Sequence, residues 1–302
     1  MRWGRTYFAA QAVAGAAWWV AVFTIPFVRE TTLGTLDPVL VAALDIPLFV
    51  VGSAIAASGV RVAATVATAW TILVAVALAG YATITTEAGW GVVLMIAAAG
   101  GSLVALGLVV FGRVPTAWII AGPFAFRPST RTRLSAHVLT TFGQIVVFWG
   151  FFLVVAPIIL SFLEKRWGVG IVFPPFVAPI GIVIIVLASS LGIASAITMS
   201  TLGKGTPLPS AMPNSLVIAG PYRFIRNPMA LAGLVQGFAV GLVSSSWLVL
   251  VYAVLGSLLW NFAVRPLEEF DLDQRFGDDY RRYRDRVRCW IPRLPAQTLT
   301  DS

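Results

Sequence analysis

Three basic side chains lie in a loop-like stretch, residues 203–228, and their types suit them to holding an anion. The stretch reads GKGTPLPSAMPNSLVIAGPYRFIRNP. Its many glycines and prolines predict a shaped loop rather than a helix. It carries Lys204, Arg223 and Arg226, and a guanidinium can pair a carboxylate through two N–H groups. The alternative is a plain connector whose positive charges mark the cytoplasmic side of a membrane.

Two adjacent carboxylates, Glu268 and Glu269, open a second polar stretch just after an apolar run. Acidic side chains at the boundary of a membrane are costly unless they are paired or functional. Because the basic loop and the acidic pair flank an apolar hairpin, we expect both to meet at the same membrane face.

The second polar stretch also has an aromatic face. Phe276, Tyr280, Tyr283 and Val287 recur at spacings of 4, 3 and 4 residues, which places them on one side of a helix. The opposite side carries Asp278, Arg281, Arg282, Asp285 and Arg286. Gly277 predicts a break into two short helices. The stretch is then either an amphipathic helix on the bilayer surface or a lid that closes a cofactor pocket with its aromatic face.

The elements that position these residues must be membrane helices. The chain is 58% hydrophobic and 11% charged, whereas a soluble domain usually has about 25% charged residues. Its mean hydropathy is +0.88. Apolar runs long enough to cross a hydrocarbon core recur along nearly the whole chain. We therefore expect an all-α, polytopic transmembrane bundle of about eight spans, with cytoplasmic amphipathic helices at the carboxyl end.

The expected spans fall into two groups. They cover residues 8–28, 36–59, 62–86, 90–112, 134–163, 171–202, 229–243 and 247–264. The seventh is short and is expected to form a tight hairpin with the eighth through Ser244, Ser245 and Ser246. Residues 1–114 form an accessory four-helix region, 115–133 a basic cytoplasmic linker, and 134–302 the core that carries the polar stretches. The accessory region could serve as a homo-oligomer surface, a wall for lipids or a stabilising annex.

The positive charges predict the orientation. With spans alternating from a cytoplasmic start, the 21 Lys and Arg fall on the inner side, except for Arg29, Lys165 and Arg166. Cytoplasmic loops favour Lys and Arg, so we expect a multi-pass protein of the inner cell membrane with both termini in the cytoplasm. This distribution also accounts for the formal charge of +8 without a nucleic-acid partner. A single cysteine and a single histidine argue against a metal site.

The two polar stretches together resemble motifs of the isoprenylcysteine carboxyl methyltransferase and phospholipid methyltransferase superfamily, which includes bacterial membrane methyltransferases. The first motif stands here as Gly220-Pro221-Tyr222-Arg223 and Arg226-Asn227-Pro228-Met229. The second motif stands as Glu268, Glu269, Leu272, Phe276, Gly277, Tyr280, Tyr283, Val287 and Pro292. The run Lys204-Gly205-Thr206-Pro207 is similar to one common in bacterial members. The resemblance covers about residues 134–295.

The resemblance implies a methyltransferase that uses S-adenosylmethionine, bound at the cytoplasmic face between the two motifs. Arg226 is expected to clamp the cofactor carboxylate, while Glu268 or Glu269 pairs its ammonium or ribose. Tyr222 or Tyr280 would pack the adenine or face the sulfonium. The implied cofactor-binding residues are Lys204, Gly205, Thr206, Gly220, Pro221, Tyr222, Arg226, Asn227, Pro228, Gly233, Glu268, Glu269 and Tyr280. The implied catalytic residues are Arg223, Asn227 and Glu269.

The sequence departs from the family pattern at the start of the seventh span. Ala230 stands where the family usually has tyrosine, and Ala232 where it has glycine, with Gly233 one place later. These changes alter the contacts or the size of the pocket. The acceptor is expected to be a lipophilic carboxylate or amine that enters from the bilayer. A carboxylate substrate needs no base and would be held by a cation such as Arg223. An amine substrate must lose a proton, and a glutamate is expected to take up that proton.

Two other functions remain open from the sequence. One is a membrane reductase of the sterol-reductase type, which has a related carboxyl-terminal architecture and uses NADPH. The other is a transporter, for which Asp45, an acidic residue inside the second span, is the main argument. Gln236 is expected to be an interhelical hydrogen-bond partner.

Overall fold

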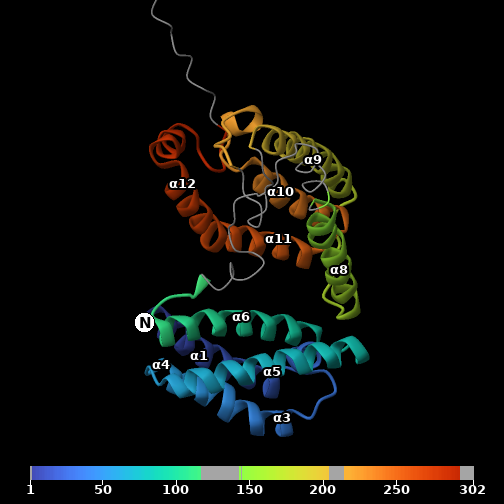
Figure 1. Ribbon diagram of the computed structural model, residues 1–302. Helices are drawn as coiled ribbons and strands as arrows, with labels where there is room; N and C mark the ends of the chain where they lie inside the picture. The colour runs from blue at the N-terminus through green and yellow to red at the C-terminus, as the bar shows by residue number, and fades with distance from the viewer. Residues whose placement is uncertain (1, 117–142, 144, 204–213, 293–302) are drawn as a thin grey trace, which may run out of the picture. The chain divides into compact units, whose positions relative to one another are not determined.

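A computed structural model describes residues 2–116, 143, 145–203 and 214–292. Every regular element among them is helical (Figure 1). Among these residues, seven helices are long and apolar enough to cross a membrane, and α10 (Pro228–Val243) is an eighth, shorter apolar helix. The prediction of an all-α, polytopic bundle of about eight spans is therefore confirmed.

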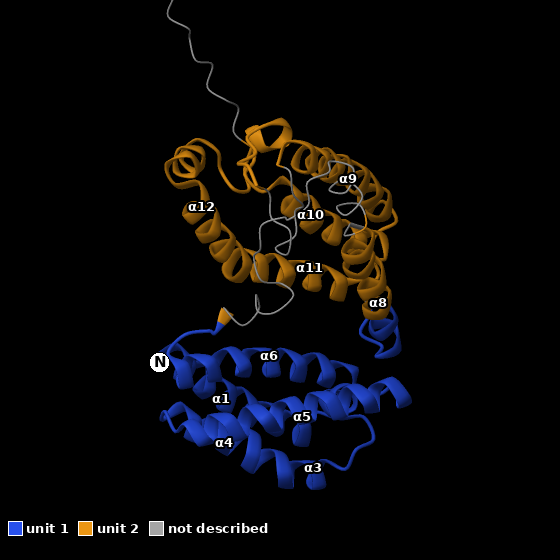
Figure 2. Ribbon diagram, viewed as in Figure 1, with its two compact units in different colours: residues 1–115, 162–170 blue, residues 116–161, 171–302 orange. Residues whose placement is uncertain are grey.

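The chain divides into two compact units (Figure 2). The first comprises residues 1–115 and 162–170, and the second comprises residues 116–161 and 171–302. The carboxyl-terminal end of one helix, α8 (Ala156–Arg166), thus belongs to the first unit. Within that unit the Arg166 side chain donates to the backbone carbonyls of Thr83 at 2.6 Å and Ile84 at 2.9 Å. These contacts were not foreseen from the sequence.

The first unit is a bundle built on α1 (Arg2–Thr24), which packs against α4 (Gly52–Ala57) and α6 (Gly89–Phe111). Pro26 starts the short α2 (Pro26–Leu33), because proline lacks the N–H that a continuing helix needs. The second span is α3 (Pro38–Asp45), η1 (Ile46–Val51) and α4 in sequence, and α5 (Arg61–Thr85) packs along α6. A side chain at Gly91 would collide with the backbone of Thr32, so this glycine permits close helix packing.

The second unit has α9 (Val177–Leu202) and α10 (Pro228–Val243) packed along each other. A β-carbon at Gly181 would lie 3.0 Å from the Ala239 carbonyl oxygen, so small residues set this spacing. The Gln236 side chain donates to the Ser189 hydroxyl across the two helices at 2.7 Å, which confirms its expected role. Another membrane helix of this unit consists of η4 (Ile145–Trp149), η5 (Phe151–Val155) and the first part of α8.

The short seventh span and its hairpin are also as expected. With its 16 residues, α10 is about 24 Å long, less than the roughly 30 Å of a hydrocarbon core. Three serines connect α10 to α11 (Trp247–Leu259) in a tight turn. The Ser246 side chain caps α11 by accepting from the Val249 N–H at 3.3 Å. The left-handed turn residue is Ser245, with φ of 50°.

The last helix does not stop at the membrane boundary. From α11 the chain continues through η8 (Trp260–Val264) into α12 (Arg265–Arg286) without an intervening loop. At Gly277 the backbone adopts φ 51° and ψ −124°, which kinks α12 and confirms the predicted break. Because the helix is continuous up to that glycine, Glu268 and Glu269 are fixed rigidly to the last span.

Candidate functional site

The two polar stretches come together in the second unit. The Asn227 side chain donates to the Glu268 carboxylate at 3.1 Å. The Arg226 guanidinium lies 3.2 Å from the Glu269 carboxylate. Residues that precede α10 therefore contact residues that begin α12, and the juxtaposition expected from the sequence is present.

A pocket of about 110 Å³ lies at this junction. Its polar walls are Arg226, Asn227, Glu268 and Glu269. The remaining lining is aromatic, apolar or sulfur-containing: Met199, Leu216, Val217, Tyr222, Met229, Ala230, Trp260, Leu272, Tyr280, Tyr283 and Cys289. The pocket thus offers both signs of charge beside aromatic rings in a space largely lined by apolar groups.

Arg226 has unused hydrogen-bonding capacity. Its side chain is 13% exposed, and its Nε and one terminal nitrogen are buried without an acceptor among the described residues. A buried guanidinium with orphaned donors is unfavourable unless an anion completes it. The backbone N–H of Arg226 donates to the Arg288 carbonyl at 3.0 Å, which fixes the position of the residue. Arg226 is therefore a preformed half of an anion site.

The two glutamates have different electrostatic surroundings. Glu269 lies between Arg226 at 3.2 Å and Arg265 at 3.8 Å, so its charge is compensated. Glu268 accepts from the neutral amide of Asn227, and no ion pair to it is present in the part of the chain that the structure describes. Glu268 is consequently the carboxylate available to a cationic ligand.

The aromatic face of α12 points into the protein. Tyr280, Tyr283 and Val287 are buried and pack with Leu216, Leu272 and Phe276. The Tyr283 hydroxyl donates to the Tyr222 carbonyl at 2.6 Å. This contact joins the segment after the kink to η7 (Gly220–Arg223), the short turn that leads into α10. Because Tyr280 and Tyr283 line the pocket, the arrangement favours the lid over the alternative of a helix on the bilayer surface.

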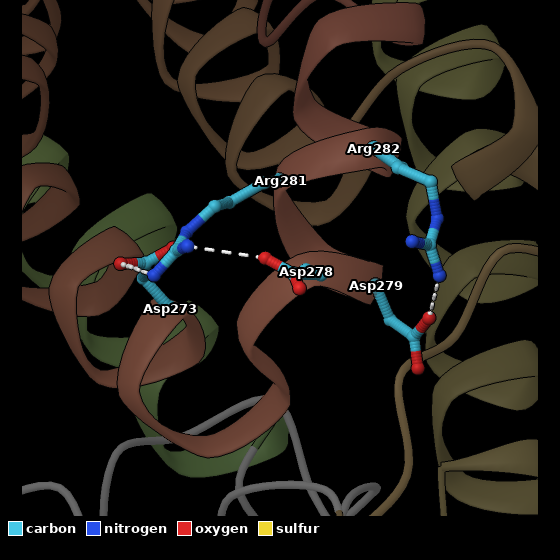
Figure 3. Close-up of polar contacts among 5 residues, drawn as sticks. All are labelled: Asp273, Asp278, Asp279, Arg281 and Arg282. Atoms are coloured by element: carbon cyan, nitrogen blue, oxygen red, sulfur yellow. Dashed lines mark hydrogen bonds and ion pairs between the residues drawn. The ribbon is translucent and has the colours of Figure 1, made fainter.

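The opposite face of α12 carries charged side chains that pair with one another (Figure 3). Arg281 contacts Asp273 at 2.9 Å and Asp278 at 3.1 Å, and Arg282 pairs with Asp279. Asp273 precedes the Gly277 kink and Arg281 follows it, so this pair links the two arms of the bent helix. Exposed ion pairs contribute little stability, and burial of the tyrosines does more to hold the bend.

Tyr222 is fixed by its turn. The side chain is 4% exposed. Burial raises the pKa of its phenol, and the charge of Glu268 acts in the same direction, so the group remains a neutral hydrogen-bond donor. Gly220 has φ of 53°, and a β-carbon there would lie 2.7 Å from the Thr198 hydroxyl of α9. Gly220 is thus required for the turn to pack on α9, a structural role besides the expected approach to a cofactor.

Several residues expected at the site do not line the pocket. Arg223 is exposed, because the tight turn of η7 directs Tyr222 inward and its neighbour outward. Gly220, Pro221 and Pro228 shape the turn and the start of α10 without forming the wall, and Gly233 faces open space. Lys204, Gly205 and Thr206 lie outside the described residues. The pocket therefore brings together Tyr222, Arg226, Asn227, Glu268, Glu269 and Tyr280.

The two positions that depart from the family pattern lie in different surroundings, one in the pocket and one in the contact between helices. Ala230 lines the pocket, so a small side chain there replaces the usual tyrosine at the wall itself. Ala232 is 1% exposed and packs toward Gly192 of α9. The first change bears on ligand contacts, whereas the second bears on how closely α9 and α10 approach.

Sequence reasoning missed several walls of the pocket. Trp260 was not predicted, and its indole N–H is buried without an acceptor among the described residues. The missed signal was periodicity, since Trp260 precedes Glu268 by about two helical turns and so shares its face. Cys289 and Met199 carried no such signal, because their positions depend on chain segments folding over the site.

Comparison with known proteins shows that the second unit is similar to methyltransferases. The sequence pattern described as phospholipid methyltransferase matches residues 177–279. Methanethiol S-methyltransferase 1 of Bradyrhizobium diazoefficiens is 35% identical over 71 residues, which cover 24% of this chain and 24% of that protein. The chain thus spans about a quarter of the length of this relative. No solved structure matches the chain. The matched segment contains α9 to the kink of α12, with both polar motifs and their apolar hairpin, so this part of the chain is similar to phospholipid methyltransferases.

Proposed function

We propose that this membrane methyltransferase uses S-adenosylmethionine and transfers its methyl group to a lipophilic acceptor that enters from the bilayer. The observation that carries the proposal is the buried Arg226 side chain with two orphaned nitrogens, set beside the uncompensated carboxylate of Glu268. An amino-acid end with one carboxylate and one ammonium complements this pair. NADPH has no ammonium to match Glu268.

The residues fit the methionine end of the cofactor. Arg226 would bind its carboxylate with the free guanidinium N–H groups, and Glu269 would hold Arg226 in place. Glu268 would bind the ammonium, and Tyr222 and Tyr280 would offer aromatic faces to the positive sulfonium. A pocket of about 110 Å³ suits this end of the cofactor rather than the whole molecule.

Methyl transfer from a sulfonium requires few catalytic groups from the protein. The bound cofactor supplies an electrophilic methyl group on a sulfonium. The walls of the pocket exclude water and align the acceptor for in-line attack. A carboxylate acceptor needs no base, whereas an amine must lose a proton, which a glutamate of the pocket would take up. Because Arg223 is exposed, our proposal gives it no contact with the reacting groups.

The acceptor is proposed to reach the pocket from within the membrane, while the cofactor arrives from the cytoplasm. The apolar walls formed by Met199, Met229 and Leu272 favour a hydrophobic acceptor. The relative from Bradyrhizobium is named for methanethiol, so a thiol joins the carboxylate and the amine as an acceptor to be tested.

The test uses the purified full chain in lipid nanodiscs with methyl-labelled S-adenosylmethionine. A lipid extract, a fatty acid, a long-chain amine and a long-chain thiol serve as acceptors, and S-adenosylhomocysteine binding is measured by calorimetry. Charged hydrogen bonds contribute about 1.5–3 kcal/mol, so Arg226→Lys should weaken binding by about tenfold or more. Arg223→Lys is the matched control and should bind normally.

Two results would overturn the proposal. One is unchanged S-adenosylhomocysteine affinity in both Arg226→Lys and Glu268→Gln. The other is binding of NADPH in preference to S-adenosylhomocysteine, which would favour the reductase alternative. Label in an extracted lipid or in one probe acceptor would identify the acceptor class.

A further inference from the structure

The first unit contains a large cavity that the methyl-transfer site does not use. Its volume is about 780 Å³, which lies within the range of roughly 300–1,000 Å³ typical of small-molecule sites. Side chains of α1, α3, α5 and α6 line it, and nearly all are apolar or aromatic. Every lining residue belongs to the first unit.

Among the described residues that line this cavity, one side chain, Asp45, is an acid. Asp45 is 6% exposed and ends α3, inside the second membrane span. Its two carboxylate oxygens accept from the indole N–H groups of Trp19 and Trp70, each at 2.8 Å. A carboxylate can accept about four hydrogen bonds, so Asp45 retains capacity beyond these two donors.

The other polar groups nearby are satisfied within the protein. Gln11 donates to the Ser53 hydroxyl at 3.0 Å and accepts from the Ser102 hydroxyl at 2.8 Å. The Tyr7 hydroxyl donates to the Ala98 carbonyl at 3.0 Å. None of these groups needs a ligand, and Asp45 has no cationic partner among the described residues.

An acid in a membrane span is costly unless something pairs with it. Two indoles stabilise the carboxylate through hydrogen bonds but bring no positive charge. The rings of Trp18, Trp70 and Tyr81 line the same cavity, and aromatic faces attract cations. A carboxylate and aromatic rings in the lining of one apolar cavity form a combination that recognises an organic cation with a hydrocarbon body.

We propose that this cavity binds a lipophilic amine, with the protonated nitrogen paired to Asp45 and the apolar body enclosed by α1, α3, α5 and α6. The site is independent of the methyl-transfer pocket, since no residue is shared between them. The accessory helices thereby gain a function as a binding module for an amphiphilic cation.

The test compares three probes with one apolar cage and different head groups: adamantylamine, adamantanol and adamantanecarboxylate. Each is titrated by calorimetry into the full chain in phosphatidylcholine nanodiscs. The amine should bind more tightly than the alcohol, and the carboxylate least of all. In Asp45→Asn the amine should bind at least about tenfold more weakly, equivalent to about 1.4 kcal/mol, while alcohol binding is retained.

Two further variants locate the site. Glu30→Gln removes one exposed negative charge elsewhere in the unit and should leave amine binding unchanged. Ala77→Trp fills part of the cavity and should abolish binding of all three probes. If Asp45→Asn fails to fold, shown by lost alcohol binding, the preference of the wild type for amine over alcohol decides the matter. Equal binding of amine and alcohol, an unchanged Asp45→Asn, or amine binding that survives Ala77→Trp would each overturn the proposal.

Discussion

The hydroxyl of Tyr283 donates a 2.6 Å hydrogen bond to the backbone carbonyl of Tyr222, although 61 residues separate them in the chain. The bond joins the lid segment of α12 to the turn that precedes α10. Both residues line the pocket, so the same contact that closes the fold of the second unit also closes its candidate site.

Removing that hydroxyl should therefore affect stability and ligand binding together. Tyr283→Phe leaves the buried Tyr222 carbonyl without its partner, which costs about 1–3 kcal/mol. We expect a lower unfolding midpoint and weaker S-adenosylhomocysteine binding. Tyr252→Phe is the control, because its hydroxyl makes a longer bond of 3.3 Å to the Phe152 carbonyl at an exposed position. Comparable losses in both variants would show that the Tyr283 contact has no special role.

The Arg226–Glu269 pair should show energetic coupling. Both side chains are mostly buried, and neighbours of this kind couple by about 0.5–3 kcal/mol in double-mutant cycles. Unfolding of Arg226→Gln, Glu269→Gln and the double variant should give a double loss smaller than the sum. The pair of Arg282 and Asp279, with side chains 64% and 71% exposed, is the control and should show no measurable coupling. Additive losses at Arg226 and Glu269 would contradict the assigned contact.

The kink at Gly277 should not tolerate a side chain. Its φ of 51° with ψ of −124° is strained for other residues by about 1–3 kcal/mol, so Gly277→Ala should lower stability and loosen the lid. Gly233→Ala is the matched control, because it lies inside α10 with open space where the β-carbon would be. Alanine there should be neutral or stabilising by about 0.5–1 kcal/mol. A stable Gly277→Ala that binds S-adenosylhomocysteine normally would argue against a fixed bend.

The single cysteine reports on the closed pocket. Cys289 is 8% exposed, and burial raises the pKa of its thiol. Because the thiolate is the reactive form, alkylation by N-ethylmaleimide should be slow. Its rate should rise at a higher pH than that of an exposed cysteine. S-adenosylhomocysteine should slow the reaction further, since Cys289 lines the pocket. Mass spectrometry measures the rate, and fast, unprotected labelling of folded protein would contradict this placement.

Much of the architecture could be predicted from local properties of the sequence. The apolar runs specified the membrane helices, because a span must satisfy its backbone internally and face lipid along its length. Gly277 and the three serines at 244–246 marked the kink and the hairpin, since both depend on the backbone preferences of a few residues. The spacing of Phe276, Tyr280 and Tyr283 predicted the inward face of α12, because residues three or four apart lie on the same side of a helix.

The tertiary structure decided which polar groups meet and which remain without partners. Arg223 and Arg226 are both arginines of the same loop. In the fold Arg223 is exposed, whereas the Arg226 side chain is largely buried against Glu269. Trp260 and Cys289 became pocket walls because segments distant in the chain fold over one site. Asp45 was recognisable as an acid in a span, but its two indole partners and its cavity arise from packing among α1, α3 and α5. Long-range packing of this kind is not encoded in any local window of sequence.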